Sequence, residues 1–285
     1  MVQSNDPYVF EQIEVEGVPV HVKHWPNNPG CCFKIIFHVG ARHDPEGKEG
    51  LAHMFEHLPF NGCPGFENSS LITEARDEIF YDDFGAYTSF DITCFHGRVP
   101  DLSNLLQVGR AAIFIRDFIN HPLLNEAEFK REVGVVEQEI WKDFSNQREV
   151  EVVKELRRTV YRDHPMGRQS RAYGWPDTVR QLSQGDCLYH HRQHYHRGNC
   201  EIILVGNLSS DDARRMLEPL VNEMPLVKKR IPPTKYPCFE PRQTERRISA
   251  ARDLDSGKGR KVTEISFLRL VPLTWPRPAI FLAGA

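Results

Sequence analysis

The stretch GLAHMFEHLPFNG, residues 50–62, places two histidines four residues apart in an otherwise apolar helical run. Residues four apart share one face of a helix, so His53 and His57 can direct their imidazole nitrogens at a common point. Pro59 disfavours helical geometry in the residue before it, which predicts a short helix that ends close to His57. Neutral imidazole is a good zinc ligand, so the pattern predicts two ligands of a metal site.

Glu56, next to His57, adds a proton acceptor to this pattern. A catalytic zinc ion needs three protein ligands and one open position for water, and Glu56 can accept a proton from that water without being a ligand. The order HxxEH is the inverse of the commoner HExxH arrangement. The alternative is that both histidines pack on a half-buried helix face, and a third ligand is needed to favour the metal site.

Candidates for that ligand lie in REVGVVEQEIWKDF, residues 131–144, within the longest helical pattern of the chain, residues 125–161. Glu132 and Glu139 are seven residues apart and face the same way, whereas Glu137 is rotated off that face. One of the aligned pair can ligate zinc while the other holds the second nitrogen of a histidine. The alternative is an ordinary solvated acidic face.

Five motifs in this order resemble the pitrilysin or insulinase family of metallopeptidases, which includes the mitochondrial processing peptidase. The match extends over roughly residues 12–225. Its motifs are GLAHMFEHLPFNG, GAYTSFDITCF (85–95), FKREVGVVEQEI (129–140), DHPMGRQSRAYG (163–174) and RGNCEIILVGNLS (197–209).

The resemblance assigns a role to each residue of the candidate site. It implies that His53, His57 and Glu139 ligate one Zn²⁺ per chain, since the family's third ligand is the later of two glutamates seven apart. It implies that Glu56 is the general base and that Glu132 supports a ligating histidine. The expected fold is α+β, a mainly antiparallel sheet covered by helices on one face.

Two departures from the family pattern bear on activity. Gly85 stands where the family usually has an asparagine that helps to polarise the substrate carbonyl, and loss of one such donor costs about 2.7–4 kcal/mol. Family members also act as two halves around the substrate, and the other half contributes an Arg-Tyr pair for which this sequence offers no candidate. We therefore expect a second half or partner subunit of the same family, or a homo-oligomer.

The segment AYTSFDITCFHGRV, residues 86–99, predicts a strand. If this is an edge strand near the zinc, an extended peptide can add to it by main-chain hydrogen bonds at Ala86, Tyr87, Thr88 and Ser89. The alternative is an ordinary strand of the sheet.

The organisation of the chain follows from composition. Residues 1–225 are expected to form the zinc peptidase domain, residues 226–261 a proline-rich and charged linker, and residues 262–285 the truncated start of a second related domain. A formal charge of −3 does not favour nucleic acid or anionic membranes as partners. No apolar run approaches the ~18 residues of a membrane span, and the first residues resemble no signal or transit peptide, which favours a cytoplasmic chain.

Other reactive side chains are expected to pack rather than react. The seven cysteines are odd in number, scattered and without a CxxC pair, so we expect reduced thiols, with Cys63 and Cys94 as small packing residues. The histidines in LYHHRQHYH, residues 188–196, have no nearby carboxylate and are expected to belong to a packing helix.

The leading hypothesis is a zinc-dependent endopeptidase that hydrolyses peptides or small unfolded proteins. The alternative is a non-catalytic scaffold or peptide-binding subunit of a two-part peptidase.

Overall fold

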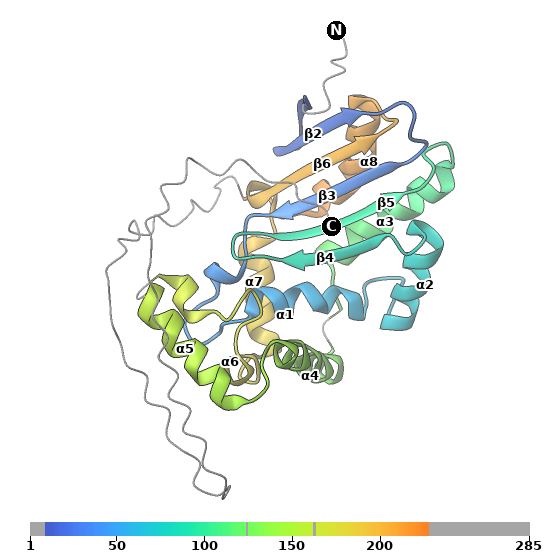
Figure 1. Ribbon diagram of the computed structural model, residues 1–285. Helices are drawn as coiled ribbons and strands as arrows, with labels where there is room; N and C mark the ends of the chain where they lie inside the picture. The colour runs from blue at the N-terminus through green and yellow to red at the C-terminus, as the bar shows by residue number, and fades with distance from the viewer. Residues whose placement is uncertain (1–8, 124, 162–163, 228–285) are drawn as a thin grey trace, which may run out of the picture.

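The computed structural model describes residues 9–123, 125–161 and 164–227, which form a six-stranded sheet with helices packed against one face (Figure 1). The strand order is β1-β2-β6-β3-β5-β4, and every neighbouring pair is antiparallel except β2 with β6. The expected α+β fold with a mainly antiparallel sheet is confirmed. The strands are β1 (Glu11–Val15), β2 (Val18–His24), β3 (Cys31–Phe37), β4 (Phe84–Thr88), β5 (Thr93–Val99) and β6 (Cys200–Gly206).

The α-helices lie in two connections, α1 and α2 between β3 and β4 and α3 to α7 between β5 and β6, and α8 follows β6. The α-helices are α1 (Leu51–His57), α2 (Ser69–Phe80), α3 (Leu105–Asn120), α4 (Glu126–Asp143), α5 (Gln147–Tyr161), α6 (Pro176–Val179), α7 (Gln184–His194) and α8 (Ser210–Glu223). Short 3₁₀ turns are η1 (Ala41–His43), η2 (Leu58–Asn61), η3 (Pro165–Arg168) and η4 (Arg197–Asn199).

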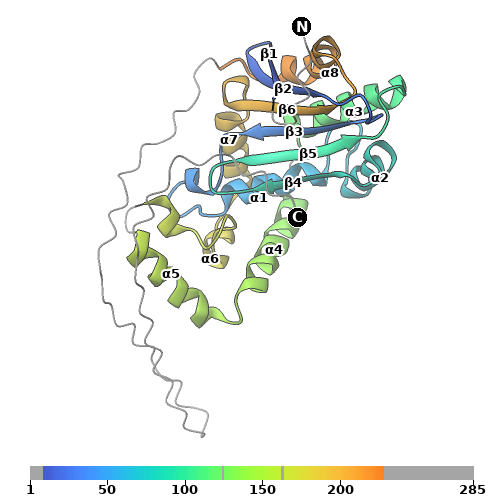
Figure 2. The same cartoon turned by 45° about the horizontal axis from the view of Figure 1, so that its top comes forward.

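Alternation along the strands gives the sheet a buried face and an open face. In β3, Phe33, Ile35 and Phe37 are buried, because successive side chains of a strand point to opposite faces. Helices α3, α7 and α8 lie behind this face in both views (Figures 1 and 2). No described helix covers the opposite face, where Lys34 and Glu201 remain half-buried.

Two expected elements are each divided in the structure. The strand predicted over residues 86–99 is a hairpin of β4 and β5, because the Ser89 hydroxyl accepts hydrogen bonds from the amides of Asp91 (3.2 Å) and Ile92 (3.1 Å) and so stabilises a turn. The helical pattern over residues 125–161 is two helices, α4 and α5. The break occurs because Asn146 accepts a hydrogen bond from the amide of Glu149 at 3.1 Å and so caps a new helix.

Helix α1 lies between the edge of the sheet and helix α4. Figure 1 shows α1 beside β4, with α4 on its other side. The helix is short, as Pro59 predicts: it ends at His57 and continues as the 3₁₀ turn η2. Its inward residues, among them Leu51, Met54 and Phe55, are buried, which anchors the histidine-bearing face.

The expected linker and second domain lie outside the described residues, apart from positions 226 and 227, so both remain predictions. Among the described residues, no helix is long and apolar enough to span a membrane.

Candidate metal site

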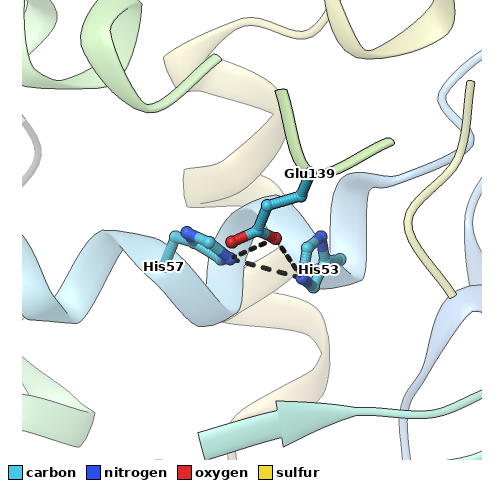
Figure 3. A group of neighbouring side chains, drawn as sticks. All are labelled: His53, His57 and Glu139. Carbon is cyan, nitrogen blue, oxygen red and sulfur yellow. Dashed lines mark hydrogen bonds and ion pairs between the residues drawn. The ribbon is translucent and has the colours of Figure 1, made fainter. Parts of the chain in front are cut away.

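Helices α1 and α4 bring three potential metal ligands together. His53 Nε2 and His57 Nε2 lie 3.2 Å apart, and Glu139 Oε2 lies 3.6 Å from the first and 3.7 Å from the second (Figure 3). Within the described part of the chain, these residues form the one group of three His, Cys, Asp or Glu side chains close enough to share an ion.

The spacing and the protonation of these groups fit a zinc ion. The point that is equidistant from the three atoms and lies in their plane is about 2.0 Å from each, which matches zinc–nitrogen and zinc–oxygen bonds of about 2.0–2.2 Å. Burial and the neighbouring His57 lower the pKa of His53 to about 3, so its imidazole is neutral, the form that binds metal. Two imidazoles and one carboxylate are the donor set of a zinc site with an open position.

Glu132 holds the other side of His57. His57 Nδ1 donates to Glu132 Oε2 at 3.3 Å, and Glu132 is almost completely buried. Burial lowers the pKa of His57, but Glu132, Glu139 and Glu56 together outweigh it, so the pKa of His57 is raised. Glu132 therefore fixes the ring of His57 and leaves Nε2 directed toward Glu139.

Arg131 extends this contact to η2, the turn that follows the histidine helix. Its guanidinium lies 3.3 Å from Glu132 Oε1 and donates to Asn61 Oδ1 at 2.7 Å. Glu137, by contrast, lies off this face of α4, where it binds Arg180 and accepts a hydrogen bond from Trp141. The seven-residue spacing thus distinguishes Glu132 and Glu139, which lie at the site, from Glu137, which lies outside it.

Glu56 is buried on the side of α1 that faces β4. The residue is 8 % exposed, and Glu56 Oε2 has no hydrogen-bond partner among the described residues. Burial raises the pKa of Glu56, although Thr88 and His57 offset part of this effect. A carboxylate with a raised pKa and an unpaired oxygen is suited to accept a proton from a bound water.

The N-terminus of α1 is anchored by residues that the sequence analysis did not identify. The buried Asp44 carboxylate accepts hydrogen bonds from the amides of Gly50 (2.8 Å) and Ala52 (2.9 Å), and from Gln169 Nε2 (3.0 Å). Burial raises the pKa of Asp44 to about 7, whereas these three donors favour its ionised form. Gln169 lies in the motif DHPMGRQSRAYG. The sequence identifies this motif by its place among the five motifs, but it does not predict the contact of Gln169 with Asp44.

The proposed substrate residues lie at the open edge of the sheet. Ala86, Tyr87 and Thr88 belong to β4, the last strand of the sheet, and Ser89 follows it directly. Gly85 precedes them in the same strand, and a Cβ added there would lie 3.4 Å from the ring of His96, an ordinary contact.

Two histidines of α7 and the cysteines near the motifs pack in the interior of the structure. The ring of His191 stacks on Phe55 at 5.0 Å, and His190 is 2 % exposed. Burial raises the pKa of Cys63 to about 12 and that of Cys94 to about 11, as expected for inert thiols. The six cysteines of the described residues are all free.

Comparison with known proteins gives two family matches. A model described as "Insulinase (Peptidase family M16)" matches residues 20–172, and one described as "Peptidase M16 inactive domain" matches residues 181–263. The boundary between the two falls inside one sheet, because β6 pairs with both β2 and β3.

The relatives are named as zinc proteases and processing peptidases. An uncharacterized zinc protease of Rickettsia bellii is 26 % identical over 221 residues, covering 77 % of this chain and 52 % of the relative. The mitochondrial-processing peptidase subunit beta of Homo sapiens is 28 % identical over 184 residues, covering 64 % of this chain and 35 % of that protein. The chain spans about half the length of the first of these relatives and about a third of the second.

Solved structures show the same fold. The periplasmic protease PqqL from Escherichia coli superposes with a TM-score of 0.68 at 18 % identity, covering 86 % of this chain and 26 % of that chain. A peptidase M16 inactive domain from Pseudomonas fluorescens gives 0.67 at 19 % identity, covering 76 % and 51 % respectively.

Proposed function

Because the chain belongs to the insulinase family, peptidase family M16, we propose that it is a zinc-dependent endopeptidase that hydrolyses peptides or small unfolded proteins. The observation that carries the proposal is the convergence of His53, His57 and Glu139 at zinc-binding distances, with the buried carboxylate of Glu56 on the same helix. This donor set leaves one position open, as a catalytic rather than a structural zinc site requires.

Each side chain has a separate task in the proposed reaction. Zinc, when bound, would act as a Lewis acid and make water nucleophilic near neutral pH. His53, His57 and Glu139 would hold the ion, and Glu132 would keep His57 oriented. Glu56 accepts the proton of the attacking water and passes it to the nitrogen of the leaving amine.

The free edge of β4 gives an extended substrate a place to bind. The amide of Ser89 donates to Ile92 O at 2.8 Å, and that of Arg98 donates to Asp83 O at 2.9 Å. Along an antiparallel pair of strands, residues that hydrogen-bond to the partner strand alternate with residues whose amides and carbonyls point away from it. Between Asp83 and Ser89, every second residue of β4 therefore points its amide and carbonyl away from β5. Ala86 and Thr88 therefore direct their amides and carbonyls away from β5, and the Thr88 amide faces Glu56, so a peptide strand that adds here lies beside Glu56.

A partner half would complete the site. One relative is named as a subunit, and a solved structure with a TM-score of 0.66 is titled the first half of the protease PqqL. We infer that this chain works with a second half of the same family, as a partner subunit or a homo-oligomer.

Gly85 favours a second candidate function, that of a non-catalytic scaffold or peptide-binding subunit. A glycine offers no side-chain donor to the substrate carbonyl at the position where the resemblance implies an asparagine. Retention of His53, Glu56, His57 and Glu139 favours the enzyme, because a scaffold has no need of all four groups.

The test is hydrolysis of a mixed pool of unstructured peptides by the zinc-loaded chain, with Glu56→Gln as the control. Glutamine keeps the shape of the side chain but cannot take a proton, so zinc should remain bound while hydrolysis falls about 10²–10⁴-fold. Equal cleavage by wild type and variant would refute the role of Glu56. Stoichiometric zinc without cleavage by the wild type would favour the binding subunit or the need for a partner half.

A further inference from the structure

The two histidines of the candidate site are held in different ways. His57 Nδ1 bonds Glu132 at 3.3 Å, whereas His53 Nδ1 is buried and has no hydrogen-bond partner in the described part of the chain. Metal-ligating histidines almost always use their second nitrogen to fix the ring. The orientation of His53 must therefore depend on another kind of contact.

The ring of Tyr173 supplies such a contact. Its centroid lies 4.5 Å from that of the His53 imidazole, with 42° between the planes. Tyr173 comes from the segment between η3 and α6, and it packs against the hydrophobic core. A planar, half-buried ring at this distance restricts rotation of the imidazole about its χ angles.

Tyr173 is itself fixed to Glu49 and Gly50, the residues directly before α1, by close backbone contacts. A Cβ added at Gly50, where φ is +101°, would lie 2.5 Å from Tyr173 O, and one added at Gly174, where φ is +77°, would lie 2.1 Å from Glu49 O. Only glycine permits this approach at both positions. Thr178 Oγ1 also donates to Glu49 O at 2.7 Å. The ring of Tyr173 is thus set relative to the helix that carries His53.

We propose that Tyr173 is a positioning residue for the metal site, and that its ring orients His53 as the Glu132 carboxylate orients His57. This inference rests on the proposed zinc centre and assigns a role to the segment DHPMGRQSRAYG. The two ligating imidazoles are then oriented by two different segments of the chain: His57 by helix α4, and His53 by the segment that precedes α6. Without the ring of Tyr173, the His53 imidazole can rotate away from the orientation that binds metal.

The test compares metal binding by Tyr173→Leu, Tyr173→Phe and the control Tyr189→Leu. Tyr189 is 63 % exposed on α7 and serves as a tyrosine outside the site. The dissociation constant of Zn²⁺ is measured by competition with a chelator, and the visible spectrum of the Co²⁺ form reports ligand geometry. Loss of a group that orients a ligand typically costs 10–100-fold in metal affinity, so we expect Tyr173→Leu to bind Zn²⁺ about 10-fold more weakly, with an altered Co²⁺ spectrum. Phenylalanine should restore both values, and Tyr189→Leu should leave them unchanged.

Several results would overturn the proposal. One is a Tyr173→Leu protein with wild-type Zn²⁺ affinity and Co²⁺ spectrum, even if its metal-free form melts at a lower temperature. Another is a loss of Zn²⁺ affinity in Tyr173→Phe equal to that in Tyr173→Leu, because the aromatic ring is then not the group that orients His53. If Tyr173→Leu does not fold, Tyr173→Met takes its place and the same two readouts decide.

Peptide hydrolysis measured in parallel separates this inference from the proposed function. Weakened metal binding in a chain that never cleaves peptides would support the role of Tyr173 and count against the peptidase. Absence of stoichiometric zinc from the wild type would overturn both.

Discussion

Replacement of Glu132 by glutamine should weaken zinc binding while the fold persists. Glutamine keeps the size of the side chain but removes the charge that His57 Nδ1 faces at 3.3 Å. The Glu132 side chain is only 11 % exposed, so solvent screens this contact little. A hydrogen bond to a charged group is worth about 1.5–3 kcal/mol, and about 1.4 kcal/mol corresponds to a factor of ten. We therefore expect zinc affinity to fall about 10–100-fold, within the usual range for such a residue.

The assay is competition for zinc between the protein and a chromogenic chelator at neutral pH, on variants that show wild-type circular dichroism. Glu137→Gln is the matched control, because Glu137 lies on the same helix but binds Arg180 and Trp141 instead of a histidine. The control should bind zinc as the wild type does. Equal affinity in Glu132→Gln and the wild type would refute the idea that Glu132 orients His57, as would an equal loss in both variants.

Two other features of the sheet yield predictions. The hydrogen bond from His38 lowers the pKa of Glu201 to about 2. The ionised Glu201 should stabilise the fold fully above a pH of about 4.5, the pKa of this group in the unfolded chain, and this stabilisation should be lost as the pH falls toward 2. The melting temperature of Glu201→Gln should therefore depend less on pH in that window than the melting temperature of the wild type does. Ala86→Pro removes an amide that faces the open edge, so it should weaken peptide binding in a titration and keep the fold, whereas Tyr87→Pro should break pairing with β5 and lower the melting temperature. Unchanged peptide affinity in Ala86→Pro would exclude strand addition at this edge.

The local part of the site was predictable from the sequence because its geometry is set by helical periodicity. Four-residue spacing placed His53 and His57 on one face, and seven-residue spacing placed Glu132 and Glu139 on another. The proline after the motif ended α1 as expected. What periodicity does not give is the distance between two helices, so the meeting of α1 and α4 was predicted only through the resemblance to known peptidases.

Two divisions of elements have local signals in the sequence. Asn146 followed by Glu149 has the spacing of a helix start, with the asparagine accepting from the amide of Glu149 and that side chain bonding back to the amide of Ser145, and it divides α4 from α5. The turn between β4 and β5 carries Ser89 and Asp91, residue types common in turns, but it has no glycine, proline or asparagine, so the segment resembled one strand. Asp44 and Tyr173 could not be assigned at all, since their roles come from contacts with residues far away in the chain.

The place of β6 in the sheet has a consequence for how the chain folds during synthesis. Residues 200–206 fill the position between β2 and β3, so the sheet is incomplete until most of the described chain has been made. All three candidate ligands are translated well before that strand. Pairings between distant segments form slowly, because the intervening chain must first be closed into a loop. A nascent chain that has just completed α4 therefore carries every metal-binding group and still has two unpaired strand edges at the centre of its future sheet.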